Sequence, residues 1–180
     1  MASEFQRIKV QAMFDAFDAD GNGYLEESDF RALAARWRGL PAVRRAGGEL
    51  AARVESVMMG WWESLAATSD TPDDAKIDMD ELMTVVDRLP SMREAVMATA
   101  DTIFDAVDEN GDGHISQKEH RKLIDTWHGR SIDTADVFDH LDADGDGYLE
   151  RAQFAVLWTQ FWTSTDPADP GNLMCGPLRG

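Results

Sequence analysis

Apolar residues recur at helical intervals on both sides of three short polar segments, which begin at residues 18, 108 and 142. Apolar side chains stand one, four and five positions before each segment. After each twelve-residue segment they follow at the first, fourth, fifth and eighth positions, with His120 as the polar exception. These intervals place the apolar residues of each flank on one face of a helix. The pattern predicts an all-α chain built from helix–loop–helix units.

A fourth unit is concealed around residues 70–81. Its flanking apolar residues, at the same intervals, are Leu65, Ala66, Leu82, Val85, Val86 and Leu89. Because one unit alone leaves an apolar helix face uncovered, four units in series predict two pairs. We expect one pair in residues 1–89, a second in 90–162, and an irregular tail in 163–180.

The three polar segments share one layout of acids, amides and glycines. Residues 18–26 and 142–150 are identical at eight of nine positions, and residues 108–116 keep the same order of oxygen-bearing side chains and glycines. The eighth residue of each segment is apolar (Leu25, Ile115, Leu149). We expect these eighth residues to pair between loops as short strands.

This spacing is typical of a twelve-residue calcium loop. Calcium takes six to eight oxygen ligands, which such a loop supplies from side chains at positions 1, 3, 5, 9 and 12 and from the backbone carbonyl at position 7. Glycine at position 6 permits the sharp turn. The candidate ligands are Asp18, Asp20, Asn22, Tyr24, Glu26 and Asp29 in loop 18–29; Asp108, Asn110, Asp112, His114, Ser116 and Glu119 in loop 108–119; and Asp142, Asp144, Asp146, Tyr148, Glu150 and Gln153 in loop 142–153.

The closing residue differs among the three loops. Only Glu119 offers the long bidentate carboxylate usual at position 12. Asp29 is one methylene shorter, which favours six-fold coordination and predicts competition by Mg²⁺ in loop 18–29. Gln153 offers one neutral oxygen, so loop 142–153 is predicted to bind calcium more weakly than loop 108–119, with Glu150 compensating in part.

The concealed loop lacks the chemistry of the others. Pro72 offers no side-chain ligand at position 3, and Ala75 replaces the turn glycine at position 6. We expect this loop to hold its helices in place without a metal ion.

The chain thus resembles a four-EF-hand protein of the sarcoplasmic calcium-binding type, and within it the calerythrin-like bacterial members. The resemblance rests on loops that start at residues 18, 70, 108 and 142, with an enlarged gap before a degenerate second loop, and on the ending Asp169–Leu173. It implies a tail that packs against the body. Pro90 is expected to end one helix, and Ser91 with Glu94 to cap the next. Since this link is short, we expect one compact globule.

Charge restricts the partners. The chain carries 34 acidic and 17 basic side chains, a net charge of −17. Nucleic acids and anionic membranes attract basic proteins, so neither is expected as a partner. A 43% hydrophobic content and six tryptophans predict a folded core rather than disorder. The ligand positions of the three loops hold 11 of the acids, so metal binding accounts for much of the excess of acidic over basic side chains.

Other sequence features favour a cytoplasmic monomer. Cys175 is the single cysteine, so no internal disulfide can form. No apolar run approaches about 18 residues, and the first residues lack the layout of a secretory signal. The motifs of hydrolases and nucleotide enzymes are missing, so no enzymatic activity is expected.

Three functions remain open at this point. A calcium buffer or transporter is favoured, because the aromatic residues and the tail are available to fill the apolar faces internally. A sensor would instead expose a Met-rich groove to a partner helix, and the methionines that favour it are Met58, Met59, Met79, Met83, Met92 and Met97. A photoprotein-like luciferin-binding oxygenase, suggested by Trp127–His128, is the outsider.

Overall fold

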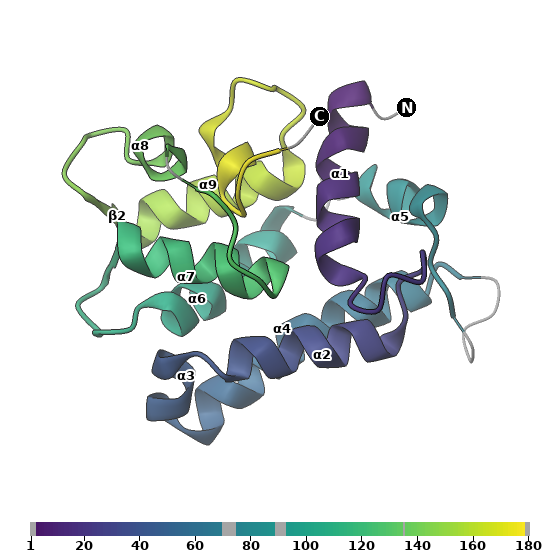
Figure 1. The fold of residues 1–180 in the computed structure, drawn as a ribbon, viewed down its shortest axis with the longest axis horizontal. Coiled ribbons are helices and arrows are strands. Elements are labelled where there is room, and N and C mark those ends of the chain that lie inside the picture. The colour runs from purple at the N-terminus through teal and green to yellow at the C-terminus, as the bar shows by residue number, and fades with distance from the viewer. Residues whose placement is uncertain (1–2, 70–74, 89–92, 135, 179–180) are drawn as a thin grey trace.

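Short capping motifs start several of the helices. In the computed structural model, which describes residues 3–69, 75–88, 93–134 and 136–178 (Figure 1), Ser3 accepts the Gln6 amide proton at 3.2 Å and Gln6 accepts that of Ser3 at 2.9 Å. Such reciprocal bonds satisfy backbone groups at a helix N-terminus. The helices are α1 (Glu4–Phe17), α2 (Glu27–Arg38), α3 (Pro41–Ala46), α4 (Gly48–Ala66), α5 (Met79–Val86), α6 (Arg93–Val107), α7 (Gln117–His128), α8 (Val137–Leu141), α9 (Arg151–Thr163) and the 3₁₀ helix η3 (Pro170–Leu173).

The eighth loop residues pair as predicted. Strands β1 (His114–Ser116) and β2 (Tyr148–Glu150) run antiparallel, with Ile115 opposite Leu149. In the other half, Leu25 and Ile77 exchange two backbone hydrogen bonds, of 2.9 and 3.0 Å. The first loop therefore pairs with the degenerate second loop and the third with the fourth. The boundary predicted at residues 89 and 90 stays a prediction and, with the helix cap expected at Ser91, lies outside the described residues.

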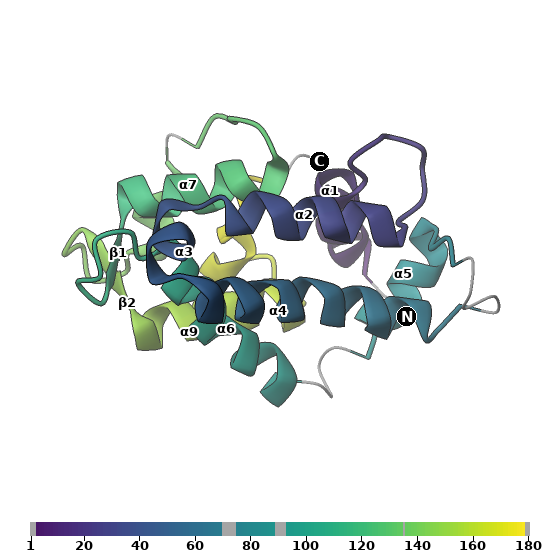
Figure 2. The same ribbon diagram turned by 90° about the horizontal axis from the view of Figure 1, so that it is seen from below.

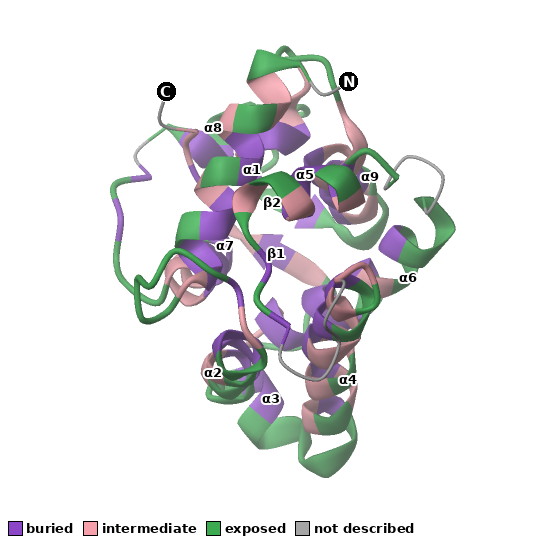
Figure 3. Ribbon diagram, turned by 90° about the vertical axis from the view of Figure 1, so that its right-hand side faces the viewer, coloured by how far each residue is buried: buried purple, intermediate pink, exposed green. Residues whose placement is uncertain are grey.

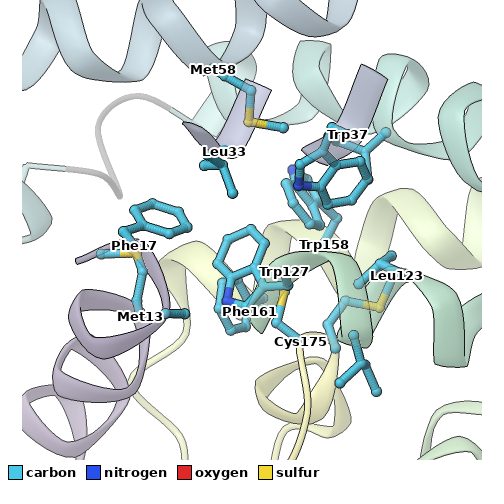
Figure 4. Packing of buried hydrophobic residues seen from close by; sticks show 14 of the residues in the cluster. Met13, Phe17, Leu33, Trp37, Met58, Leu123, Trp127, Trp158, Phe161 and Cys175 are labelled. Atoms are coloured by element: carbon cyan, nitrogen blue, oxygen red, sulfur yellow. The ribbon is translucent and has the colours of Figure 1, made fainter. Parts of the chain in front are cut away.

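The predicted helix faces meet in one core. Its buried residues are purple on the ribbon of Figure 3. On both sides of the first loop, the apolar residues named by the spacing rule are at most 6% exposed. Three tryptophans, Trp37, Trp127 and Trp158, lie almost completely buried at its centre (Figure 4). Trp61 and Trp162 are only half-buried. The all-α EF-hand architecture and the compact globule are confirmed. Within the described residues, no helix is long and apolar enough to cross a membrane.

The enlarged gap before the second loop contains an extra helix that the spacing rule did not predict. Pro41 starts α3, and Gly47 ends it with a φ of +83°. Proline is favoured in the first turn of a helix, and glycine accepts the positive φ that ends one. Pro41 and Gly47 were the available signal, but a helix of six residues is too short to reveal a periodic pattern.

Arg36, in α2, joins the two pairs of hands. Its Nε donates to the Thr126 carbonyl at 3.1 Å and its Nη2 to the Trp127 carbonyl at 2.9 Å, both in the last turn of α7. The same Nη2 lies 3.5 Å from the Ala16 carbonyl at the end of α1. Burial lowers the pKa of the guanidinium. A cation at helix C-termini satisfies carbonyls that lack helical partners, so one side chain holds the first and third hands together.

The tail packs on the body through buried polar contacts. His120 lies 2.9 Å (Nε2) from the Met174 carbonyl, and His128 lies 2.8 Å (Nε2) from that of Cys175. Burial lowers the pKa of His120 to about 4, so the ring is neutral at pH 7 and its Nε2–H donates the bond. His120 occupies the position that an apolar residue holds in the other hands because it must reach this carbonyl.

Lys9 of α1 also holds the tail. Its ammonium donates to Asn172 Oδ1 at 2.9 Å, the Ser164 carbonyl at 3.0 Å and the Gln160 carbonyl at 3.3 Å. Burial lowers its pKa from 10.5 to about 8. Because this pKa is depressed in the folded state, the desolvation cost is complete below pH 8 and disappears as the pH rises toward 10.5.

We predict that Lys9→Met lowers the free energy of unfolding by about 2 kcal/mol at pH 7. The change relieves the desolvation cost of the ammonium but removes the donor from Asn172 Oδ1 and the Ser164 carbonyl, and the loss outweighs the gain. Urea unfolding of calcium-saturated protein measures the change. Arg7→Met is the control, because Arg7, also on α1, makes an exposed ion pair with Asp80, worth at most about 1 kcal/mol. Equal stability of the two variants would contradict the role assigned to Lys9.

Candidate metal centres

Two glycines give each of the loops 18–29, 108–119 and 142–153 the same turn. The glycines at positions 4 and 6 have φ values of 70° and 84° in loop 18–29, 70° and 79° in loop 108–119, and 69° and 87° in loop 142–153. Residues with a Cβ atom are strained in this region. These glycines are Gly21, Gly23, Gly111, Gly113, Gly145 and Gly147.

Hydrogen bonds across each loop hold the acidic side chains in place. The position-1 carboxylate accepts the N–H of the position-6 glycine, at 2.9, 3.0 and 2.8 Å in chain order. The side chain at position 5 accepts the N–H of position 7 at 2.8, 2.9 and 2.9 Å. The three loops thus repeat the same geometry as well as the same residue types.

The closing side chain acts in a similar way in all three loops. Asp29, Glu119 and Gln153 each accept the N–H of position 9 at 2.8 Å. The second oxygen of Asp29 accepts the position-2 N–H at 3.1 Å, and that of Glu119 does so at 2.9 Å. Gln153 has no second oxygen, and its Nε2 donates to Asp144 at 3.1 Å instead. The amide nitrogen of Gln153 therefore lies beside the carboxylate of Asp144, which the sequence predicts as a calcium ligand.

Two groups of carboxylates converge closely enough to hold one cation. The oxygens of Asp18, Asp20 and Asp29 lie within 4.8 Å of one another, and so do those of Asp142, Asp144 and Asp146. Among the described residues, the acids of loop 108–119 do not converge to this degree. Hard oxygen donors of this kind suit Ca²⁺ and Mg²⁺. Ligation by these six acids stays a prediction, as it does for the other predicted ligands: Asn22, Tyr24, Glu26, Asp108, Asn110, Asp112, His114, Ser116, Glu119, Tyr148, Glu150 and Gln153.

The first loop has a cationic neighbour that sequence reasoning missed. Lys76 belongs to the degenerate loop, and its Nζ lies 3.1 Å from Glu26 Oε1. Asn22 Nδ2 donates to Glu26 Oε2 at 2.7 Å. The bonds from Lys76 and Asn22 lower the pKa of Glu26, whereas burial raises that of Asp29. The place of Lys76 directly before Ile77 was the available signal, since the bridge between Leu25 and Ile77 brings the two loops together.

We predict that Mg²⁺ at millimolar concentration competes with Ca²⁺ more strongly at loop 18–29 than at loop 108–119. Asp29 is one methylene shorter than Glu119, which favours one ligand oxygen over two, and six-fold coordination suits Mg²⁺. Calcium calorimetry with and without Mg²⁺ measures the competition, and Asp29→Glu should reduce it about 10-fold. An unchanged calcium isotherm on adding Mg²⁺ would contradict the prediction.

The degenerate loop is only partly described. Pro72 lies outside the described residues, and Ala75 is buried at the position of the turn glycine. Glu81, at the closing position, accepts the Asp78 N–H at 3.0 Å and helps to cap α5. The closing acid makes the same bond to the position-9 N–H as the closing residues of the other three loops, and the absence of metal from this loop stays a prediction.

Comparison with known proteins agrees with the four units. The model of an EF-hand domain pair matches residues 6–36 and 73–123, and the model of a single EF hand matches residues 134–152. The sarcoplasmic calcium-binding protein alpha chain of Penaeus vannamei is 25% identical over 187 residues, which cover 96% of this chain and 95% of the relative.

Solved structures share the fold over the whole length. Okadaic acid binding protein 2.1 superposes with a TM-score of 0.76 at 16% identity, covering 100% of this chain and 99% of its own. The sarcoplasmic calcium-binding protein of amphioxus does so with a TM-score of 0.68 at 18% identity, covering 99% and 100%. The narrower likeness to calerythrin-like bacterial proteins stays a prediction. The loop geometry, the matched models and the full-length relatives together identify the chain as a calcium-binding EF-hand protein of the sarcoplasmic calcium-binding type.

Proposed function

We propose that the protein is a cytoplasmic calcium buffer or transporter that takes up about three ions, at loops 18–29, 108–119 and 142–153. The observation that carries the proposal is the closure of the apolar faces of the third and fourth hands by the tail. The tail covers the third and fourth hands, where Met174 and Cys175 are buried, and Arg36 joins the first hand to the third. A sensor must open such faces when calcium arrives.

The methionines support the same choice. Met58 and Met83 are buried in the common core and Met59 packs against it, as expected for residues that fill irregular space. Met97, 44% exposed, is an exception, and Met92 lies outside the described residues. Methionines fixed in a closed core are not available to a partner helix, so no protein partner is proposed.

The proposed role is non-catalytic. The relatives compared above are calcium-binding proteins, which agrees with the expectation that this chain is not an enzyme. A photoprotein-like oxygenase would need Trp127 and His128 to face a bound substrate. Trp127 is instead 1% exposed among other aromatic rings, and His128 is bonded to the tail.

A dye-binding titration tests buffer against sensor. Anilinonaphthalene sulfonate fluorescence is recorded in chelator and then in saturating calcium, at physiological Mg²⁺, with calorimetry on the same samples. A buffer is expected to bind about three calcium ions with little gain in dye signal. A several-fold gain in calcium, together with capture of an amphipathic helical peptide, would favour the sensor and overturn the proposal.

A further inference from the structure

An apolar cavity of about 470 Å³ lies between α4, α5 and α6 and reaches α1 and α9. Its inner wall is formed by buried side chains, including Phe17, Phe30, Leu65 and Val96. Its outer edge carries exposed residues of α4 and α6, two helices that lie side by side in Figure 2. Cavities of this size enclose drug-sized molecules, and they occur between helices of bundles.

Gly60 keeps part of this space empty. It lies inside the 19-residue helix α4, where glycine is less favourable than alanine. Close backbone packing often explains such a glycine, but a Cβ atom added at Gly60 would meet no atom within 4 Å. Gly60 instead lines the cavity. Gly60 thus weakens α4 without allowing another part of the protein to pack closely. The space beside it remains available to a ligand.

The walls define the chemistry of that ligand. Trp61 and Trp162 are half-buried on the cavity wall, and Trp61 stacks on Phe17 at a ring distance of 6.1 Å and an angle of 14°. Half-buried indole faces suit flat aromatic molecules. Among the described residues that line the cavity, none is acidic and Arg88 is the one charged residue. In a protein of net charge −17, this environment favours a neutral ligand over an anion.

Two hydroxyl groups provide polar contacts. Ser64 Oγ donates to the Gly60 carbonyl at 2.8 Å, and Thr68 Oγ1 donates to the Leu65 carbonyl at 2.7 Å. Each hydroxyl donates its proton to a carbonyl of α4, and its oxygen lone pairs can still accept a hydrogen bond. A ligand with one N–H or O–H group would therefore be oriented at this wall.

We propose that this cavity binds a neutral, flat, mainly aromatic small molecule that carries a hydrogen-bond donor. The site is separate from the calcium loops, but it touches the first of them. Phe17 directly precedes Asp18, and Phe30 directly follows Asp29. Both phenylalanine rings face the cavity, so the ligand contacts the two residues that frame a candidate metal centre.

The test uses N-phenyl-1-naphthylamine, a neutral aromatic probe with one N–H group whose fluorescence rises in apolar surroundings. The full chain, in calcium and in chelator, is expected to bind one probe molecule saturably with a Kd of about 1–100 µM. Gly60→Leu places a side chain in the cavity and should weaken binding at least about 10-fold, while thermal stability is unchanged or higher. No saturable binding by the natural sequence would overturn the proposal.

Gly48→Leu is the matched control, because it adds the same side chain to the same helix outside the cavity. It should bind the probe like the natural sequence. Probe binding that survives Gly60→Leu, or that appears only with calcium, would assign the signal to an exposed face and overturn the site. Calcium calorimetry on both variants keeps this result separate from the proposed calcium role, which predicts the same ion uptake in each.

Discussion

Replacing Glu119 by glutamine is expected to weaken calcium binding at loop 108–119 by about 100-fold. Glu119 is 5% exposed, and its two oxygens already face the loop, where they accept the N–H groups of Glu109 and Ser116. A bidentate carboxylate supplies two ligand oxygens and one charge, whereas glutamine supplies one neutral oxygen. The variant also tests a comparison within the molecule, since glutamine is the natural residue at the same position of loop 142–153.

Calorimetry of the full chain measures this loss as the disappearance of the tightest site. The matched control is Glu109→Gln, which removes a charge at position 2 of the same loop. Glu109 pairs with Lys122, and this bond lowers the pKa of the carboxylate. The control should change calcium affinity by less than about 5-fold, because Glu109 is not a predicted ligand and its charge is already paired with Lys122. Equal losses in both variants would show that charge, not ligation by Glu119, sets the affinity.

The calcium loops were predictable because nearly all their contacts are local. A glycine at position 6 and an acid at position 1 meet across five residues, so spacing alone brings them together. The helix faces were predictable for a similar reason, since burial follows the helical period. Even the pairing of loops followed from one apolar residue, at the eighth position of each loop.

The features that sequence reasoning missed depend on contacts between distant residues. Arg36 reaches carbonyls about ninety positions away, and Lys9 reaches the tail across more than one hundred and fifty. Neither has a spacing rule, because nothing local records which helix end will lie nearby. The cavity at Gly60 was equally hidden, since a glycine within a helix has several explanations until its surroundings are known. Sequence patterns thus predict the hands, and tertiary packing decides how they are joined.

The opposite substitution, Gln153→Glu, is expected to strengthen calcium binding at loop 142–153 by about 10- to 100-fold. In the natural sequence the Gln153 amide donates a hydrogen bond to Asp144. This bond stabilises one of the converging carboxylates when no cation is bound. Glutamate removes that donor and adds a bidentate ligand. With calcium the gain in coordination dominates. Without calcium, the new charge joins Asp142, Asp146 and Glu150, and repulsion should lower the melting temperature by several degrees.

The two effects have opposite signs, which makes the experiment decisive. Melting curves in chelator and in calcium should move apart in Gln153→Glu relative to the natural sequence, and calorimetry should show a second tight site. Gln117→Glu is the control, because it adds the same charge at an exposed helix position that is not a candidate ligand. If Gln153→Glu left calcium affinity unchanged, Glu150 would already be closing the loop, and the affinity order predicted from position 12 would be wrong. If Gln117→Glu raised affinity as much, attraction by net charge rather than coordination would explain the gain.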